Sequence, residues 1–232
     1  MIPSFNPSDR VLALDFDHNC YDTEAFLLFE IRQRMLEKWN IPVDAWQEAY
    51  ETAANTGYSL EAHRDELIKI LKHEPFSLSD IQEFEKQMNF SKYLYPDVLP
   101  LLIKAKEKGY KTMLLSFGAE SWQDKKVKGV GLDKLMDVIF YTKEHGGKVD
   151  VLKNYAEDCA KVIFVDNSGR ELDEVKKELQ KVETYFMNRV PIEAMQTDDE
   201  FVKMRFNESR KIAIRQAVFE HTRVTTFNEI EL

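Results

Sequence analysis

The stretch Val11-Leu-Ala-Leu-Asp15-Phe-Asp17-His-Asn-Cys-Tyr-Asp22-Thr23 places two carboxylates, two positions apart, at the end of a short apolar run. Its branched, apolar residues 11–16 predict a β-strand, and the polar residues 17–22 predict a loop. Residues two apart on a strand point to the same side. Two crowded anions cost free energy unless a cation, a shared proton or chemistry compensates. The pair therefore indicates either a functional site or a solvated loop.

The composition narrows the class of protein. The chain has 232 residues, enough for one large domain or for a core with a smaller insert, and its formal net charge is -9. This charge, with no long basic block, argues against nucleic-acid binding. No apolar run reaches the roughly 18 to 20 residues that cross a bilayer, and residues 1–10 lack the features of a signal peptide. We expect a cytoplasmic protein that binds neither nucleic acid nor membranes.

The two cysteines, Cys20 and Cys159, have neither metal-type spacing nor a disulfide framework, and they are expected to fill core or loop space.

Residues 23–93 have the pattern of consecutive helices. Apolar side chains recur at three- and four-residue steps over 24–39, which predicts an amphipathic helix with Thr23 as its N-cap. Helical patterns continue over 45–54, 59–72 and 78–88, separated by Pro42, Gly57 and Pro75. This part of the chain is therefore predicted to be all-helical.

Strands and helices alternate in the remainder. Strands are expected at 111–116, 138–141, 162–165 and 184–187, and helices at 98–108, 121–130, 149–155 and 172–181. With the first strand, this pattern predicts an α/β fold: a five-stranded parallel sheet with helices on both faces. Residues 204–219 have helical spacing and are expected to form a packing helix, and 224–232 to add a short strand and turn.

Asp15, Ser116 and Asp166 each fall at the carboxyl end of a different predicted strand, which is where parallel sheets bind their ligands. A carboxylate can attack phosphorus, but cations must offset its repulsion from an anionic substrate. A second acid must protonate the leaving oxygen and then activate water. Asp15 and Asp17 fit these two roles.

The residues resemble the haloacid dehalogenase (HAD) superfamily, phosphatase branch. The first family motif is an apolar strand followed by Asp-x-Asp-Gly-Thr-Leu-x-Asp-Ser/Thr, and residues 15–23 match it as Asp-Phe-Asp-His-Asn-Cys-Tyr-Asp-Thr. The resemblance implies that Asp15 is the nucleophile and a magnesium ligand. It implies that Asp17 is the general acid and base, with its backbone carbonyl also on the metal.

Three further motifs follow in the family order. In Met113-Leu-Leu-Ser116-Phe-Gly, the resemblance implies that the Ser116 hydroxyl and the neighbouring backbone N–H of Phe117 hold phosphoryl oxygens. Lys148, after two glycines, matches the family lysine that contacts the substrate. In Val162-Ile-Phe-Val-Asp166-Asn-Ser-Gly, Asp166 is implied to bind Mg2+. The expected cofactor is Mg2+ and the expected metal ligands are Asp15, Asp17 and Asp166.

The order of the motifs also places a helical cap between the first and second strands. By the resemblance, residues 1–22 and 94–232 form a Rossmann-like HAD core, and 23–93 form a cap that excludes water and selects the substrate. The implied activity is Mg2+-dependent hydrolysis of a small phosphate monoester, a phosphorylated metabolite, through an aspartyl-phosphate. The presence of Asp17 favours phosphate over halide as the leaving group. The oligomeric state is left open.

The chain also departs from the family pattern. His18, Asn19 and Cys20 replace the usual Gly-Thr-Leu, Phe117 stands where many members carry Asn, and Asn167 replaces an acid. Two alternatives therefore remain: a phosphoryl transferase such as a sugar phosphomutase, and a non-catalytic binding protein that kept the fold.

Overall fold

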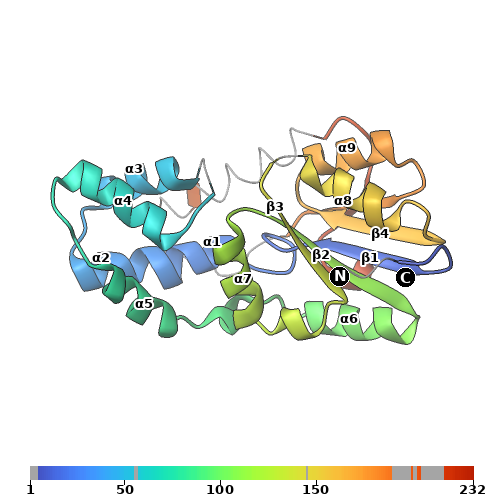
Figure 1. Cartoon of the computed structure of the whole chain (residues 1–232), viewed down its shortest axis with the longest axis horizontal. Helices are drawn as coiled ribbons and strands as arrows, with labels where there is room; N and C mark the ends of the chain where they lie inside the picture. The colour runs from blue at the N-terminus through green and yellow to red at the C-terminus, as the bar shows by residue number, and fades with distance from the viewer. Residues whose placement is uncertain (1–4, 55–56, 145, 190–199, 201–202, 205–216) are drawn as a thin grey trace.

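The computed structural model describes residues 5–54, 57–144, 146–189, 200, 203–204 and 217–232. Within these residues, six parallel strands form one sheet in the order β3-β2-β1-β4-β5-β6 (Figure 1). The strands are β1 (Arg10–Asp15), β2 (Tyr110–Phe117), β3 (Val138–Thr142), β4 (Lys161–Asp166), β5 (Glu183–Met187) and β6 (Thr222–Val224). The sequence predicted a core of five strands and a further short strand within residues 224–232. The further strand is present as β6, which begins at Thr222 and pairs with Tyr185 to Met187 of β5, so it becomes the sixth strand of the same sheet.

Helices cover both faces of the sheet. Leu12 and Leu14 of β1 share an apolar cluster with helices α6 (Val98–Glu107) and α7 (Glu120–Gly129). Val11 and Ala13 share the opposite cluster with α8 (Gly147–Ala156) and α9 (Gly169–Glu178). Both sets of strand residues are fully buried, which explains why β1 is apolar without alternation. The predicted α/β class and Rossmann-like parallel core are confirmed.

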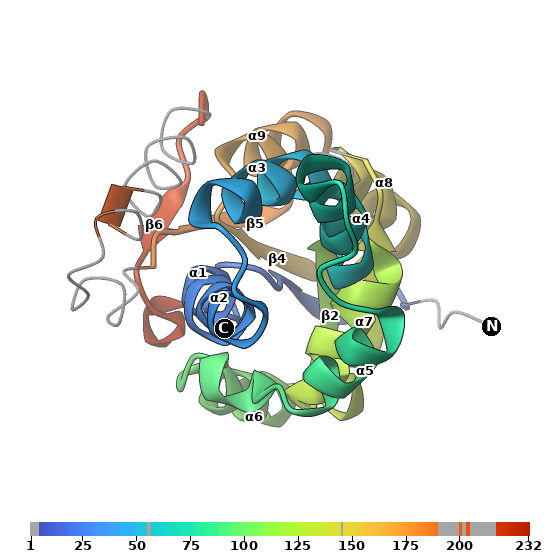
Figure 2. The ribbon, with the colours of Figure 1, turned by 90° about the vertical axis from the view of Figure 1, so that its left-hand side faces the viewer.

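The helices between β1 and α6 extend away from the sheet at one end of the molecule (Figures 1 and 2). They are α1 (Thr23–Ala25), η1 (Phe26–Gln33), α2 (Arg34–Trp39), α3 (Val43–Ala54), α4 (Leu60–Leu71), α5 (Leu78–Lys86) and η2 (Phe90–Tyr93). One apolar cluster runs from Leu14 in the sheet through Phe26 to Trp46 in α3. The division into a core domain and a cap at residues 23–93 stays a prediction, and the helices expected there are present.

The first of these helices differs from the expected amphipathic α-helix. Its middle, η1, is π-helical, and most of its side chains are buried rather than one face alone. Its N-cap is also one residue earlier than predicted: the Asp22 carboxylate accepts the N–H of Ala25 at 3.0 Å. Thr23 is not the cap, because its hydroxyl donates to Asp17 instead.

Three further predictions concern the helix at residues 204–219, the two cysteines and membrane-spanning segments. The packing helix predicted at residues 204–219 lies largely outside the described residues, so it stays a prediction. Both Cys20 and Cys159 are free thiols. Within the described ranges, no helix is both long and apolar enough to cross a membrane.

His63 is a fully buried polar residue in the helical segment. Its Nε2 lies 3.1 Å from the Trp46 carbonyl oxygen, and its Nδ1 lies 3.0 Å from the Tyr58 hydroxyl. A carbonyl can only accept, so Nε2 carries the hydrogen and Nδ1 accepts from Tyr58. Burial lowers the pKa of His63 to about 4, against the effect of the Trp46 hydrogen bond, so the ring is neutral at pH 7.

We expect His63 to make the protein acid-sensitive. Between about pH 6.5 and about pH 4, the ring binds a proton in the unfolded chain but not in the folded one, so stability falls as pH falls. The full loss is on the order of 3 kcal/mol, from 1.36 kcal/mol per pKa unit. Urea unfolding at several pH values will show a flatter decline for His63→Gln than for the wild type. His73→Gln, at an exposed histidine, is the control and will keep the wild-type slope. Equal slopes for all three proteins would contradict this assignment.

Candidate active site

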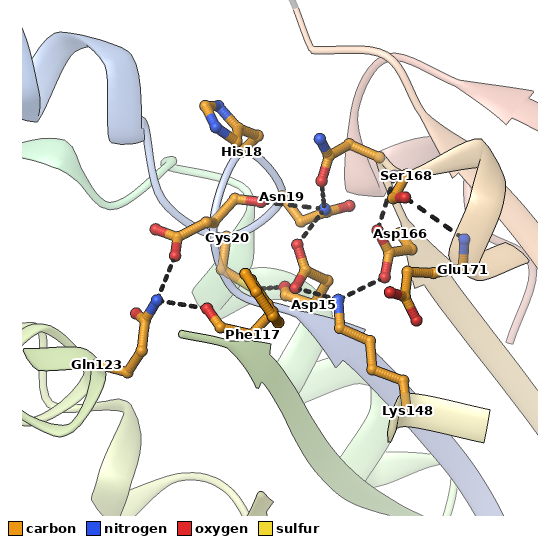
Figure 3. A network of polar contacts seen from close by, with 12 residues as sticks. Asp15, His18, Asn19, Cys20, Phe117, Gln123, Lys148, Asp166, Ser168 and Glu171 are labelled. Atoms are coloured by element: carbon orange, nitrogen blue, oxygen red, sulfur yellow. Dashed lines mark hydrogen bonds and ion pairs between the residues drawn. The ribbon is translucent and has the colours of Figure 1, made fainter. Parts of the chain in front are cut away.

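Three of the predicted site residues meet at the carboxyl edge of the sheet. Asp15 ends β1 and Asp166 ends β4 (Figure 3). Ser116 lies near the end of β2. The parallel register pairs Asp15 with Leu115 and Leu14 with Val165, which brings the carboxyl ends of β1, β2 and β4 to one level. All three side chains are buried, with at most 4% of any residue exposed.

Lys148 lies between the two strand-end carboxylates. Its Nζ is 2.6 Å from Asp15 Oδ1 and 2.6 Å from Asp166 Oδ2. The turn before α8 positions it: Gly146 adopts a positive φ of 87°, and its N–H donates to Glu171 at 3.2 Å. Burial alone would lower the pKa of Lys148, but the charges of Asp15 and Asp166 raise it, so the ammonium group stays charged.

Asp15 has a donor on each of its carboxylate oxygens. Lys148 contacts Oδ1, and the Asn19 side-chain amide contacts Oδ2 at 2.8 Å. Burial raises the pKa of Asp15 to about 8; the Lys148 charge opposes this rise and the Asp166 charge reinforces it. The carboxylate is therefore held in place but is costly to ionise, as expected for an anion kept out of water.

Asp17 is held by three donors from other elements. Its Oδ1 accepts from Lys126 Nζ and from the Thr23 hydroxyl, each at 2.6 Å. Its Oδ2 accepts from Gln123 Nε2 at 2.8 Å. Burial works to raise the pKa of Asp17, but the Lys126 charge and these hydrogen bonds lower it overall. The carboxyl is thus ionised at neutral pH.

Lys126 and Gln123 are site residues that the sequence did not reveal. They lie three residues apart on α7, on one face of that helix, and both are at most 5% exposed. Gln123 also donates to the backbone carbonyl of Phe117 at 2.7 Å, which ties α7 to the end of β2. A buried lysine in a mostly polar helix gives no periodic signal, so only the packing of α7 identifies it.

The two predicted substrate-binding residues of the second motif lie at the end of β2. The Ser116 hydroxyl is fully buried and has no hydrogen-bond partner among the described residues. Phe117 is half-buried and precedes Gly118, whose φ of 135° turns the chain and whose N–H donates to Thr142. A buried hydroxyl with no partner in the described protein can bond to a ligand oxygen. The substrate roles of Ser116, Phe117 and Lys148 stay predictions.

A cavity of ≈ 180 Å³ opens beside Asp17, between the helical segment and the core. Its walls are mainly apolar and aromatic, and its polar end is formed by the residues that surround Asp17. The apolar lining residues are Phe26, Leu27, Ile31, Tyr50, Ala54, Tyr58, Phe117, Ala119 and Trp122, and the polar ones are Asp17, Thr23, Gln123 and Lys126. Asp17 lines this cavity, whereas Asp15 does not.

The loop after β1 is anchored by Arg189. This guanidinium makes two bonds to the Asp97 carboxylate, at 2.8 and 2.9 Å, and donates to the backbone carbonyl of Asn19 at 2.7 Å. It also lies over the rings of Tyr95 and Phe227. Within the loop, His18 has a positive φ of 60° where the family motif has Gly, so the left-handed turn is kept at some cost in strain.

The predicted magnesium ligands do not fit a divalent cation as they are placed. The Asn19 amide nitrogen lies 2.8 Å from Asp15 Oδ2 and 3.3 Å from the Asp17 carbonyl oxygen, so a donor faces two of the expected ligand atoms. Asp166 has both oxygens in use, by Lys148 and by the N–H of Ser168 at 2.7 Å. Among the described residues, no three His, Cys, Asp or Glu side chains are grouped to hold a metal ion. The magnesium roles of Asp15, Asp17 and Asp166 stay predictions.

Comparison with known proteins identifies the family. The model of the haloacid dehalogenase-like hydrolases matches residues 10–219. The chain belongs to this family of hydrolases. A search of curated proteins finds no match.

Solved structures share the fold at low sequence identity. A protein from Burkholderia xenovorans, described as a haloacid dehalogenase-like hydrolase, is 19% identical with a TM-score of 0.70, over 96% of this chain and 95% of that one. A Thermotoga maritima protein described as a β-phosphoglucomutase is 19% identical with a TM-score of 0.56, over 93% and 94%. The L-2-haloacid dehalogenase of Xanthobacter autotrophicus is 16% identical with a TM-score of 0.55, over 95% and 96%. These likenesses concern the fold alone.

Proposed function

We propose that this HAD-like hydrolase cleaves a small phosphate monoester through an aspartyl-phosphate on Asp15. The observation that carries the proposal is the buried group of Asp15, Lys148 and Ser116 at one sheet edge. A carboxylate held by an ammonium group stands there near a hydroxyl that has no partner among the described residues. An attacking carboxylate, a fixed cation and a hydroxyl donor are the parts that phosphoryl transfer needs.

The proposed reaction has two steps. An Asp15 oxygen bonds to phosphorus while the bond from phosphorus to the leaving oxygen breaks, and the leaving oxygen takes a proton from the Asp17 carboxyl or from solvent, which the Asp17→Asn variant below distinguishes. Water then attacks the aspartyl-phosphate and gives its proton back to the same group, phosphate leaves, and the Asp15 carboxylate is restored. Lys148 offsets negative charge on the transferring oxygens, and the Ser116 hydroxyl donates to one of them. No step is assigned to Mg2+, because the Asn19 amide faces its expected ligands.

A screen of phosphate monoesters tests this function, with phosphate release as the readout and with EDTA or Mg2+ in parallel. Hydrolysis by the wild type that disappears in Asp15→Asn is the expected result. The phosphoryl transferase alternative predicts a phosphorylated product in place of free phosphate. Ligand binding without release of phosphate from any ester would favour the non-catalytic alternative and contradict the proposal.

A second candidate, hydrolysis of a carbon–halogen bond, is favoured by the contacts of Asp17. Lys126, Thr23 and Gln123 hold this carboxyl as an anion, so it has no proton to donate at neutral pH. A halide leaves without a proton, whereas an alkoxide needs one. The apolar cavity beside Asp17 also suits an alkyl halide. Chloride release from 2-chloropropionate, measured beside the phosphate screen, separates the two activities.

The identity of the leaving group tests the role of Asp17. If Asp17 passes protons in phosphoester hydrolysis, Asp17→Asn will slow cleavage of an alkyl phosphate by about 100- to 10,000-fold. It will slow 4-nitrophenyl phosphate far less, because that leaving group departs as a stable anion. Initial rates on both esters provide the comparison, and Asp124→Asn, on the partly exposed side of α7, is the control. An equal loss on both esters would mean that Asp17 positions the site without transferring a proton.

A further inference from the structure

The side-chain amide of Asn19 lies in the cluster of oxygens that the family motif would direct at a metal. Its Nδ2 is 2.8 Å from Asp15 Oδ2, 3.3 Å from the Asp17 carbonyl oxygen and 2.9 Å from Asn167 Oδ1 (Figure 3). These three oxygens come from two distant segments of the chain, residues 15–17 and Asn167, and one NH2 group faces them all. We propose that the Asn19 amide takes the position of the divalent cation and that this chain does not bind Mg2+ there.

The second amide of the cluster leads to the same conclusion. Asn167 can be turned by 180°: its NH2 group then faces the Asp17 carbonyl oxygen at 3.2 Å and Asp15 Oδ2 at 3.3 Å, and it replaces Oδ1 as the neighbour of the Asn19 amide at 2.9 Å. In either orientation of Asn167, an amide NH2 group is directed at the two oxygens that a metal would use. Hydrogen-bond donors satisfy these oxygens, whereas a hard cation needs them as bare ligands.

The position of Asn19 is fixed by its surroundings. Its side chain is fully buried, and its backbone carbonyl accepts from Arg189, which Asp97 holds in turn. The chain also turns back on itself at this point, where the N–H of Cys20 donates to the Phe16 carbonyl at 2.9 Å. The Asn19 side chain lies in a packed interior, not in an exposed loop, so a cation could enter only if this buried amide were displaced.

The third expected metal ligand, Asp166, also has hydrogen-bond donors on both of its carboxylate oxygens. Lys148 and the N–H of Ser168 each occupy one oxygen of Asp166, so this carboxylate holds the lysine in place. In this cluster, positive charge comes from Lys148 and the remaining hydrogen bonds come from amides. The inference concerns cation binding only, so it stands or falls separately from the proposed phosphatase activity.

Binding of Mn2+, followed by the electron paramagnetic resonance signal of the free ion, tests the inference without any substrate. Asn19→Asp replaces the donor with an acceptor of the same size, beside Asp15 and the Asp17 carbonyl. We expect this variant to bind Mn2+ at least about tenfold more tightly than the wild type, and to gain thermal stability when Mn2+ or Mg2+ is added. Asn40→Asp, the same change at the exposed end of α2, is the control and will behave like the wild type.

Asn19→Ser provides a second test if crowding of two carboxylates prevents the first variant from folding. It removes the amide and leaves Asp15 Oδ2 and the Asp17 carbonyl open, so it will also bind Mn2+ more tightly than the wild type. Wild-type protein that binds Mn2+ as tightly as these variants, with loss of binding in Asp15→Asn, would overturn the inference. Two folded variants that bind no better than the wild type would also overturn it, because Asn19 would not be what keeps the cation out.

Discussion

Asp15→Asn will reduce turnover by at least about 1,000-fold, because an amide cannot replace the carboxylate as the attacking group. Both Asp15 oxygens contact donors, Lys148 and Asn19, so the loss will not come from a missing anchor. The measurement is the initial rate on whichever substrate the screen identifies, with mass spectrometry of trapped enzyme to detect a covalent adduct on Asp15.

The fold of Asp15→Asn will be kept. The new amide has the size of the carboxylate and can place its oxygen toward Lys148, and Lys148 keeps its contact with Asp166. Burial raises the pKa of Asp15 to about 8, so ionising this residue costs stability above its ordinary pKa, and the neutral amide removes that cost. The melting temperature at pH 8 will therefore equal or exceed that of the wild type.

Asp158→Asn is the matched control for this experiment, since Asp158 is an exposed aspartate outside the site. It will keep wild-type turnover. Retained activity in Asp15→Asn at an unchanged melting temperature would show that another group is the nucleophile and would remove the basis of the proposed mechanism.

The meeting of Asp15, Ser116 and Asp166 could be predicted from the sequence because it follows from simple rules. Short apolar runs identify the strands, alternation with helices makes the sheet parallel, and parallel strands share one carboxyl edge. Lys148 could not be identified as a site residue from its local sequence, because a lysine that follows two glycines is common in turns. Its order relative to the other motifs placed it, and the structure brings its Nζ to 2.6 Å from Asp15 and from Asp166.

The side-chain contacts that hold Asp17 and Asn19 in place could not be predicted from the sequence, because each depends on how elements distant in the chain pack together. Lys126 reaches Asp17 across 109 positions in the chain, and Arg189 reaches Asn19 across 170. Thr23 illustrates the same limit locally: its place before a helix suggested an N-cap, yet the hydroxyl donates to Asp17 and Asp22 caps the helix. Local patterns place elements, whereas side-chain partners are decided by tertiary packing.

Lys148→Met will destabilise the protein by about 3–5 kcal/mol at neutral pH, the usual cost of removing one partner from a buried ion pair. Lys148 is 3% exposed and is the ammonium group that contacts both Asp15 and Asp166. Methionine fills much of the same space, so the loss will come from the two carboxylates left without their cation. Urea unfolding with linear extrapolation measures this difference.

The pH dependence of Lys148→Met separates charge from packing. Asp15 is already hard to ionise in the wild type, where burial raises its pKa to about 8. Without the lysine, burial and mutual repulsion will make both carboxyls harder to ionise in the folded state. Relative to its unfolded chain, the folded variant will then bind more extra protons than the folded wild type does, so its stability will rise more steeply than that of the wild type as pH falls from 8 toward 5. A variant that has only lost packing would instead keep the wild-type pH profile.

Two further variants complete the test. Lys153→Met, at a partly exposed lysine on the same helix, is the control; the ion pair it loses, with Glu178, lies at the surface, so we expect little change in stability. Adding Asp166→Asn to Lys148→Met removes one of the two unpaired charges and will restore part of the lost stability at pH 8. A double variant no more stable than Lys148→Met, or a Lys148→Met protein that unfolds like Lys153→Met, would show that Lys148 does not neutralise this pair of carboxylates.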